Sequence, residues 1–155
     1  MPDDDEDFSE LVREVGPRLK QALIATLGGQ AGREAAADAL AWGWEHWPKL
    51  RAMDNPAGYL YRVGRNGGSR LYRRRIEFPP AAAPPDGTPW VEPGLPDALA
   101  QLSEAQRVAV LLIHGFGWTY RDVAAYLGVS AGTVQKHAER AMARLRDELK
   151  VEIHA

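Results

Sequence analysis

The 155-residue sequence predicts an all-α protein of two small helical domains joined by a proline-rich linker. Apolar residues recur at three- and four-residue intervals on both sides of that linker, as amphipathic helices require. Seven prolines fall between about residues 76 and 96, and no helical periodicity crosses them. We therefore expect a helical N-terminal domain at residues 1–75, the linker at 76–96 and a helix-turn-helix domain at 97–155.

The composition is that of an ordinary folded protein, with 45% hydrophobic and 26% charged residues. The absence of cysteine excludes a disulfide framework and a thiolate metal site. No apolar run approaches the roughly 20 residues that cross a bilayer. The N-terminus is acidic, whereas a secretory signal begins with positive charge. These features predict a soluble cytoplasmic protein.

Charge is distributed unevenly along the chain, although its net value is only −2. Residues 3–10 hold six acids and no base, whereas residues 49–75 hold a single acid, Asp54, among eight basic residues. A local basic excess is typical of a surface that binds a polyanion such as nucleic acid. A solvated helix face explains such a cluster equally well.

The N-terminal domain should begin with two helices. The first is predicted over residues 8–27, with a break or kink at Gly16-Pro17 because an interior proline removes a helical hydrogen bond. The second should run from about residue 33 to 47 and end before Pro48. Its predicted buried face consists of Ala36, Leu40, Trp44 and Trp47.

A third helix should start at Asn55-Pro56, with asparagine as the N-cap and proline at the first helical position. Its expected inward stripe is Leu60, Val63, Gly67 and Leu71. Its expected outward face is Arg62, Arg65, Ser69 and Arg73. Glycines 64, 67 and 68 lower helix propensity, so they predict either close backbone packing or a weak point.

Three helix starts are expected in the C-terminal domain. Ser103 with Gln106 has the spacing of a capping box, and so does Thr119 with Asp122. Gly128 should form a left-handed turn before Ser130, the predicted cap of the last helix. The first of these helices should bury Val108, Leu111, Leu112 and Phe116, and the last Val134, Ala138, Ala141 and Leu145.

The segment from residue 119 to 140 has the pattern of a DNA-binding helix-turn-helix. A recognition helix needs small or polar residues where it enters the major groove and long donors beyond them. The chain offers these at Ser130 and Thr133, followed by Gln135, Lys136, His137 and Arg140. Glutamine suits adenine edges, and lysine and arginine suit guanine or phosphate. A small three-helix module that packs onto protein is the competing interpretation.

Residues 99–112 (LAQLSEAQRVAVLL), 117–134 (GWTYRDVAAYLGVSAGTV) and 140–145 (RAMARL) resemble the −35-binding domain of bacterial sigma factors. The small extracytoplasmic-function (ECF) group fits best. The N-terminal residues 16–19 (GPRL), 44–47 (WEHW), 55–66 (NPAGYLYRVGRN) and 73–75 (RRR) resemble the matching −10-binding domain. The resemblance therefore extends over nearly the whole chain.

The resemblance implies a transcription factor without enzymatic chemistry or cofactor, whose partners are core RNA polymerase and promoter DNA. An anti-sigma factor is a further candidate partner. The implied −35 contacts are Ser130, Thr133, Gln135, Lys136, His137 and Arg140. The implied −10 contacts are Lys49, Arg51, Arg62, Arg65, Asn66, Arg70, Arg73 and Arg74. The loop at about residues 49–55, with Met53 and Asp54, is where the family captures a flipped base.

The helix that grips the polymerase clamp in this family is usually rich in acidic and amide residues. Here only Glu34 and Asp38 remain in that role. Trp42 lies off the buried stripe, so it is either a lid on a neighbouring loop or an interface anchor, and we favour the interface. The run Gln135-Lys136-His137 replaces a more common basic-serine-arginine run, which predicts an atypical −35 preference.

Two other functions are compatible with parts of the sequence. A one-component regulator would join the same helix-turn-helix to an N-terminal sensor, but a sensor has little use for an outward arginine stripe. A nuclease could hold a metal between Glu34 and Asp38, one helical turn apart. The four histidines show no ligand spacing, however, and a solvated face explains these acids better.

Overall fold

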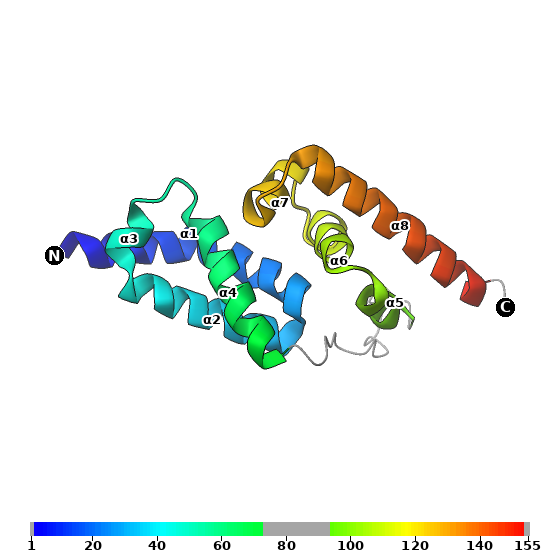
Figure 1. The fold of residues 1–155 in the computed structure, drawn as a ribbon, viewed down its shortest axis with the longest axis horizontal. Helices are drawn as coiled ribbons and strands as arrows, with labels where there is room; N and C mark the ends of the chain where they lie inside the picture. Colours follow the sequence, from blue (N-terminus) through cyan, green and yellow to red (C-terminus); the bar gives the residue numbers. More distant parts are fainter. Residues whose placement is uncertain (1, 73–93, 154–155) are drawn as a thin grey trace, which may run out of the picture.

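The computed structural model describes residues 2–72 and 94–153, and all the regular structure in these ranges is helical (Figure 1). The N-terminal half contains α1 (Pro2–Leu27), α2 (Gly29–Glu45), α3 (Trp47–Arg51) and α4 (Pro56–Tyr72). The C-terminal half contains α5 (Leu95–Gln101), α6 (Glu104–Val110), the π-helical turn η1 (Leu111–Gly115), α7 (Tyr120–Leu127) and α8 (Ala131–Ile153). The all-α prediction is confirmed. Among the described residues, no helix combines the length and apolarity needed to span a membrane.

The helices α1, α2 and α4 form the core of the N-terminal half, with Leu19, Leu23 and Leu60 completely buried. Gly32 allows α2 to approach α1 closely. A Cβ atom at this position would lie 2.4 Å from the Cα atom of Ile24. The two backbones touch here, so only glycine fits.

The break predicted at Gly16-Pro17 is wrong, because α1 continues through Pro17 as one helix. Proline at this position removes the hydrogen bond to the carbonyl of Arg13. Both Pro17 and Arg13 are exposed, so water can satisfy that carbonyl. A proline on the solvent side of a long helix is tolerated for this reason.

The second predicted helix is shifted. α2 begins at Gly29 and ends at Glu45, before Pro48 is reached. Pro48 lies in the first turn of the short helix α3. Trp44 was expected to be buried but is 46% exposed, with its ring 5.2 Å from that of Phe8. Gly43 is buried in its place, because the side chains of Leu50 and Leu60 occupy the space beside it.

The start of α4 is as predicted, since the Oδ1 atom of Asn55 accepts the backbone N–H of Gly58 at 3.0 Å. Gly64 packs closely, with a hypothetical Cβ only 2.6 Å from a methyl of Leu23. Gly67 is exposed and open to solvent, so its place in the predicted inward stripe is wrong. The side chain of Leu71 lies outside the described residues.

In the C-terminal half, α5 begins at Leu95, inside the end of the predicted linker. The remainder of that linker lies outside the described residues. Ser103 caps α6 as expected. Phe116, predicted to be buried, is 43% exposed because η1 ends the helix at Gly115. The buried face predicted for α8 is confirmed in full, comprising Val134, Ala138, Ala141 and Leu145.

Candidate nucleic-acid interface

The helix-turn-helix consists of α7, a short turn and the first part of α8. Thr119 and Asp122 form a complete capping box at the start of α7. Burial acts to raise the pKa of Asp122, but hydrogen bonds from Thr119 and Arg18 outweigh it and lower that pKa. Gly128 ends α7 with φ of +69°, a left-handed conformation that favours glycine. The relative placement of α7 and α8 is therefore fixed by short-range contacts.

The first turns of α8 present a polar face to solvent. The Oγ atom of Ser130 accepts the backbone N–H of Thr133 at 3.1 Å, and the two hydroxyl groups lie 2.9 Å apart. Gln135, Lys136 and Arg140 are exposed on the same helix. Gln135 donates to Glu139 at 3.0 Å, an exposed bond that can exchange for another acceptor. These residues have the chemistry and position for base and phosphate contacts.

His137 behaves differently from its neighbours in the predicted set. It is half-buried and lines a groove of about 300 Å³ between the two halves of the molecule. Arg62 and Arg65 of α4 line the same groove. Predicted contacts for the −10 element and for the −35 element thus lie side by side in this structure.

The basic residues before α4 are partly engaged within the N-terminal half. Lys49 is exposed, but Arg51 forms ion pairs with Asp4 at 2.7 Å and Asp7 at 3.4 Å. Its guanidinium also lies 5.9 Å from the ring centre of Trp47. The acidic N-terminus therefore neutralises one of the predicted DNA contacts. In the adjoining loop, Met53 is half-buried and Asp54 is exposed.

The arginines of α4 do not all point to solvent. Arg62 is exposed above the ring of Tyr59, as predicted. Arg65 instead reaches Glu104 of α6, so the expected outward orientation is wrong for this residue. Asn66 is exposed. The side chains of Arg70, Arg73 and Arg74 lie outside the described residues.

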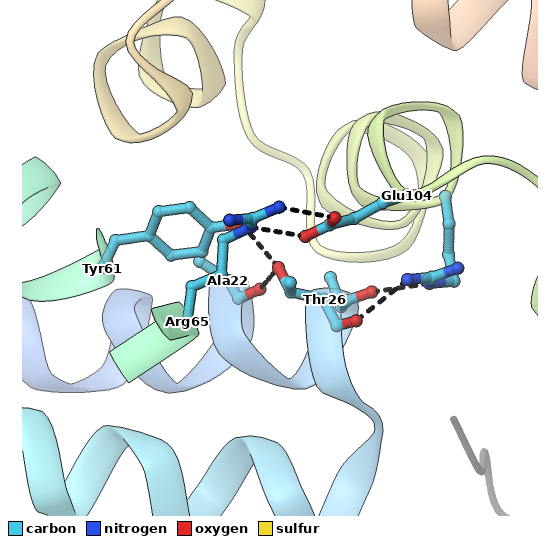
Figure 2. Close-up of polar contacts among 7 residues, drawn as sticks. Ala22, Thr26, Tyr61, Arg65 and Glu104 are labelled. Atoms are coloured by element: carbon cyan, nitrogen blue, oxygen red, sulfur yellow. Dashed lines mark hydrogen bonds and ion pairs between the residues drawn. The ribbon is translucent and has the colours of Figure 1, made fainter. Parts of the chain in front are cut away.

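A polar cluster joins the two halves, and Figure 2 shows Arg65 and Glu104 meeting across the boundary. The Nε atom of Arg65 donates to Oε1 of Glu104 at 2.7 Å, and Nη2 donates to Oε2 at 2.8 Å. The hydrogen bonds that Arg65 donates to Glu104, opposed by a smaller effect of burial, raise the pKa of Arg65. This is the bidentate geometry that a guanidinium uses with carboxylates and phosphates.

Arg107 is the buried charged residue of this cluster, with only 2% of its surface exposed. Its Nε atom donates to the carbonyl of Ala25 at 3.1 Å and its Nη2 atom to that of Thr26 at 2.9 Å. These carbonyls end α1, where the helix dipole and unpaired oxygens favour a cation. Burial lowers the pKa of Arg107, although nearby Glu104 opposes that shift. Arg107 therefore caps a helix of the other half.

Thr26 and Tyr61 form the floor of the cluster (Figure 2). The Thr26 hydroxyl donates its proton to the carbonyl of Ala22 at 2.8 Å, so Tyr61 must be the donor in their 2.6 Å contact. Burial raises the pKa of Tyr61 to about 12, against the opposing effect of the bond to Thr26. The phenol is therefore neutral at physiological pH.

Four more contacts cross the same boundary. Arg18 pairs with Asp122 at 3.3 Å and lies 5.0 Å from the ring centre of Trp118. The indole nitrogen of Trp118 donates to Gln21 at 2.8 Å. Asn55 donates to the carbonyl of Ala125 at 2.8 Å. Together with the helix contacts, they show that α7 packs against α4 while α6 and η1 pack against α1.

The contacts between the two halves were not predicted from the sequence, nor were the roles of Arg107, Glu104 and Arg18 in them. One signal was present: Arg107 lies four residues before Leu111, on the predicted buried stripe of its helix. A charged residue on such a stripe requires a partner from elsewhere. The sequence offered no way to identify that partner, because it is backbone carbonyl oxygen.

The predicted polymerase-binding residues lie on α2. Glu34 is half-buried and accepts a hydrogen bond from Gln30 at 2.8 Å, and Asp38 is exposed. Trp42 is half-buried, with its ring 4.3 Å from that of His46 and 5.4 Å from that of Tyr59. It therefore has packing partners within the chain, and part of the ring is accessible. In the described ranges, no group of three or more acids or histidines is arranged to hold a metal ion.

Comparisons with known proteins agree with this arrangement. Residues 94–145 match the family described as sigma-70, region 4. The chain is 32% identical over 159 aligned residues to the RNA polymerase sigma-E factor of Streptomyces antibioticus, covering 93% of this chain and 85% of that protein. It is 37% identical to the RNA polymerase sigma factor CarQ of Myxococcus xanthus, over 64% of this chain and 59% of CarQ.

Solved structures show the same fold. The sigma factor RpoE of Bartonella quintana, crystallised with the anti-sigma factor NepR, superposes with a TM-score of 0.66 at 25% identity, covering 94% of this chain and 98% of RpoE. CnrH, solved with the cytosolic domain of CnrY, gives a TM-score of 0.63 at 23% identity, covering 95% of this chain and 90% of CnrH.

The sigma-E match extends across both halves and favours a sigma factor over the one-component regulator. Sigma factors form a family of non-enzymatic transcription initiation factors, so the match also favours a sigma factor over a nuclease. The chain belongs to the bacterial RNA polymerase sigma factors of the extracytoplasmic-function group, which direct core polymerase to promoters by reading −35 and −10 elements.

Proposed function

We propose that the two halves of this sigma factor divide promoter recognition between them. The N-terminal half, residues 1–75, would read the −10 element and bind core polymerase. The C-terminal half would read the −35 element, and we place its start at residue 94 because α5 begins at Leu95. The segment between them would connect the two readers. The observation that carries this proposal is the exposed polar face of α8 beyond a fixed turn.

For the −35 element, Ser130 and Thr133 lie in the first turn of α8, where backbone N–H groups favour a phosphate. Gln135, Lys136 and Arg140 follow on the exposed face and would reach base edges and backbone. His137 would join them once the groove between the halves opens.

For the −10 element, we assign Lys49, Arg51, Arg62, Arg65, Asn66, Arg70, Arg73 and Arg74 to the nontemplate strand and its phosphates. The loop before α4, with Met53 and Asp54, would receive the flipped base. Unstacking that base costs a few kcal/mol, which contacts from the loop and the arginines must offset.

Core polymerase would bind along α2. Glu34 and Asp38 supply the charge there, and the accessible part of Trp42 supplies an apolar contact. Because the Trp42 ring already stacks on His46, its orientation is fixed before polymerase arrives. Ordering a side chain in advance lowers the entropic cost of binding.

The two readers must separate to do this work. Positions −35 and −10 are about 25 base pairs apart, or roughly 85 Å of duplex at about 3.4 Å per pair. In this structure Arg62 and His137 line the same groove. The arrangement described here therefore represents a closed form, in which both elements cannot be read together.

We further propose that the protein acts in the cytoplasm, catalyses no bond chemistry and needs no cofactor. An anti-sigma factor is a further partner we propose, because RpoE, a relative in fold, was crystallised with one. Such a partner would act by holding the closed form.

Run-off transcription with core polymerase on genomic fragments tests the function and yields a promoter. Replacing Arg62 and Arg65 together by alanine should weaken open-complex formation. The slope of log affinity against log salt concentration should become less steep by about one per lost phosphate contact. Arg13→Ala, at an exposed arginine in the middle of α1, is the matched control. Open complexes that form equally well with the double variant would refute the −10 assignment.

A further inference from the structure

The ion pair between the halves uses a residue assigned above to DNA. Arg65 belongs to the −10-reading helix, and the two nitrogen atoms along one edge of its guanidinium, Nε and Nη2, both donate to Glu104. The two side chains remain 42% and 39% exposed, so the pair is accessible to solvent and to competing anions. The edge of the guanidinium that would clasp a phosphate is therefore occupied by a carboxylate.

Carboxylate and phosphate oxygens are interchangeable ligands for this edge of a guanidinium. The Nε/Nη2 edge of Arg65 cannot clasp both at once in the bidentate geometry. Whatever strengthens the Arg65–Glu104 pair must therefore weaken the contact of Arg65 with DNA, and the coupling is reciprocal.

We propose that Glu104 takes the place of a DNA phosphate at Arg65, so that closure of the two halves and −10 binding compete for one guanidinium. This inference rests on the −10 role assigned to Arg65. Single-stranded −10 DNA then favours opening, and closure suppresses binding of DNA by the sigma factor alone.

Neighbouring contacts make the competition consequential. Glu104 also lies close enough to Arg107 to act on its pKa, and Arg107 inserts into the end of α1. Glu104 and Arg107 lie on the same helix, so loss of the Glu104 charge removes the ion pair with Arg65 while Arg107 keeps its bonds to the carbonyls of Ala25 and Thr26. The groove beside the pair, lined by Arg62 and His137, would open in the same step.

Glu104→Gln tests the idea, because it keeps the shape of the side chain and removes its charge. Glu139→Gln is the matched control: it removes the same charge from an exposed residue of α8 that accepts a hydrogen bond from Gln135, within its own helix. The natural chain contains no cysteine, so Ser9→Cys with Ala143→Cys provides two exposed dye sites, one in each half. Energy transfer between the dyes reports opening.

An exposed ion pair contributes little, so the expected effect is about a two- to fivefold rise in affinity for single-stranded −10 DNA, the nontemplate sequence found by run-off transcription. Energy transfer should fall in Glu104→Gln and stay unchanged in Glu139→Gln. Adding Arg65→Gln to Glu104→Gln should abolish the gain in DNA affinity while energy transfer stays as low as in Glu104→Gln.

Two results overturn the proposal. One is a Glu104→Gln variant whose dye distance and DNA affinity match those of the parent chain. The other is a gain in affinity that survives Arg65→Gln. Failure of the −10 assignment is seen separately, as normal −10 binding by the Arg65→Gln variant in the polymerase holoenzyme, where the halves are already apart.

Discussion

The two halves of the molecule are built by different means. In the C-terminal half, three helices start at a side-chain cap: Ser103, Thr119 and Ser130. The hydroxyl oxygen of each cap accepts a backbone N–H only three residues later. In the N-terminal half, α2 and α3 start without a side-chain cap. There the helices are held by close approach at Gly32, Gly43 and Gly64.

This difference determines how each half responds to change. A capped helix loses about 1 kcal/mol with its cap and keeps its neighbours in place. A close contact between two backbones cannot absorb even one methyl group without moving a helix. The N-terminal half should therefore be the more sensitive to small substitutions, and the C-terminal half the more tolerant.

The largest effect is expected for Gly32→Ala. The added Cβ would lie 2.4 Å from the Cα atom of Ile24, so α1 and α2 must separate, at a cost of about 3 kcal/mol or more. Gly67→Ala is the control, because nothing lies within 4 Å of a Cβ there. It should stabilise α4 by roughly 0.5–1 kcal/mol. Urea unfolding measures both, and equal effects would contradict the comparison.

The same difference explains what the sequence could predict. The helix-turn-helix follows from local spacing: Thr119 with Asp122, then Gly128, then Ser130. Each of these residues does what its type and position indicate, since its partners are a few residues away. The exposed face of α8 can also be predicted, because it lies on the side of the helix opposite the buried stripe.

Features that depend on distant residues were predicted less well. Trp44 is exposed because Gly43 faces Leu50 and Leu60, which periodicity alone does not reveal. Arg65 is directed toward α6 because Glu104, 39 residues later, binds it. The groove between the halves was missed for the same reason. A pattern within one helix carries no information about which other helix will cover it.

The next largest effect is expected at Arg107, where the two halves meet. Arg107→Ala leaves the carbonyls of Ala25 and Thr26 without their donor, at a cost of about 2–3 kcal/mol. The halves should then unfold in two transitions rather than one, and energy transfer between dyes on Ser9→Cys and Ala143→Cys should fall. Arg144→Ala, an exposed arginine bonded to Gln106, should change stability by less than about 0.5 kcal/mol. A single transition with unchanged energy transfer would show that Arg107 does not hold the halves together.

The smallest effect is expected at the cap of α7. Thr119→Ala removes the acceptor for the backbone N–H of Asp122, a 3.0 Å bond, and should cost about 1 kcal/mol. Thr119→Ser retains the hydroxyl and should recover most of that stability. Because the cap is local, the dye distance between the halves should stay the same in both variants. If Thr119→Ser is as unstable as Thr119→Ala, or if either variant opens the molecule, the C-terminal half depends on its surroundings as much as the N-terminal half does.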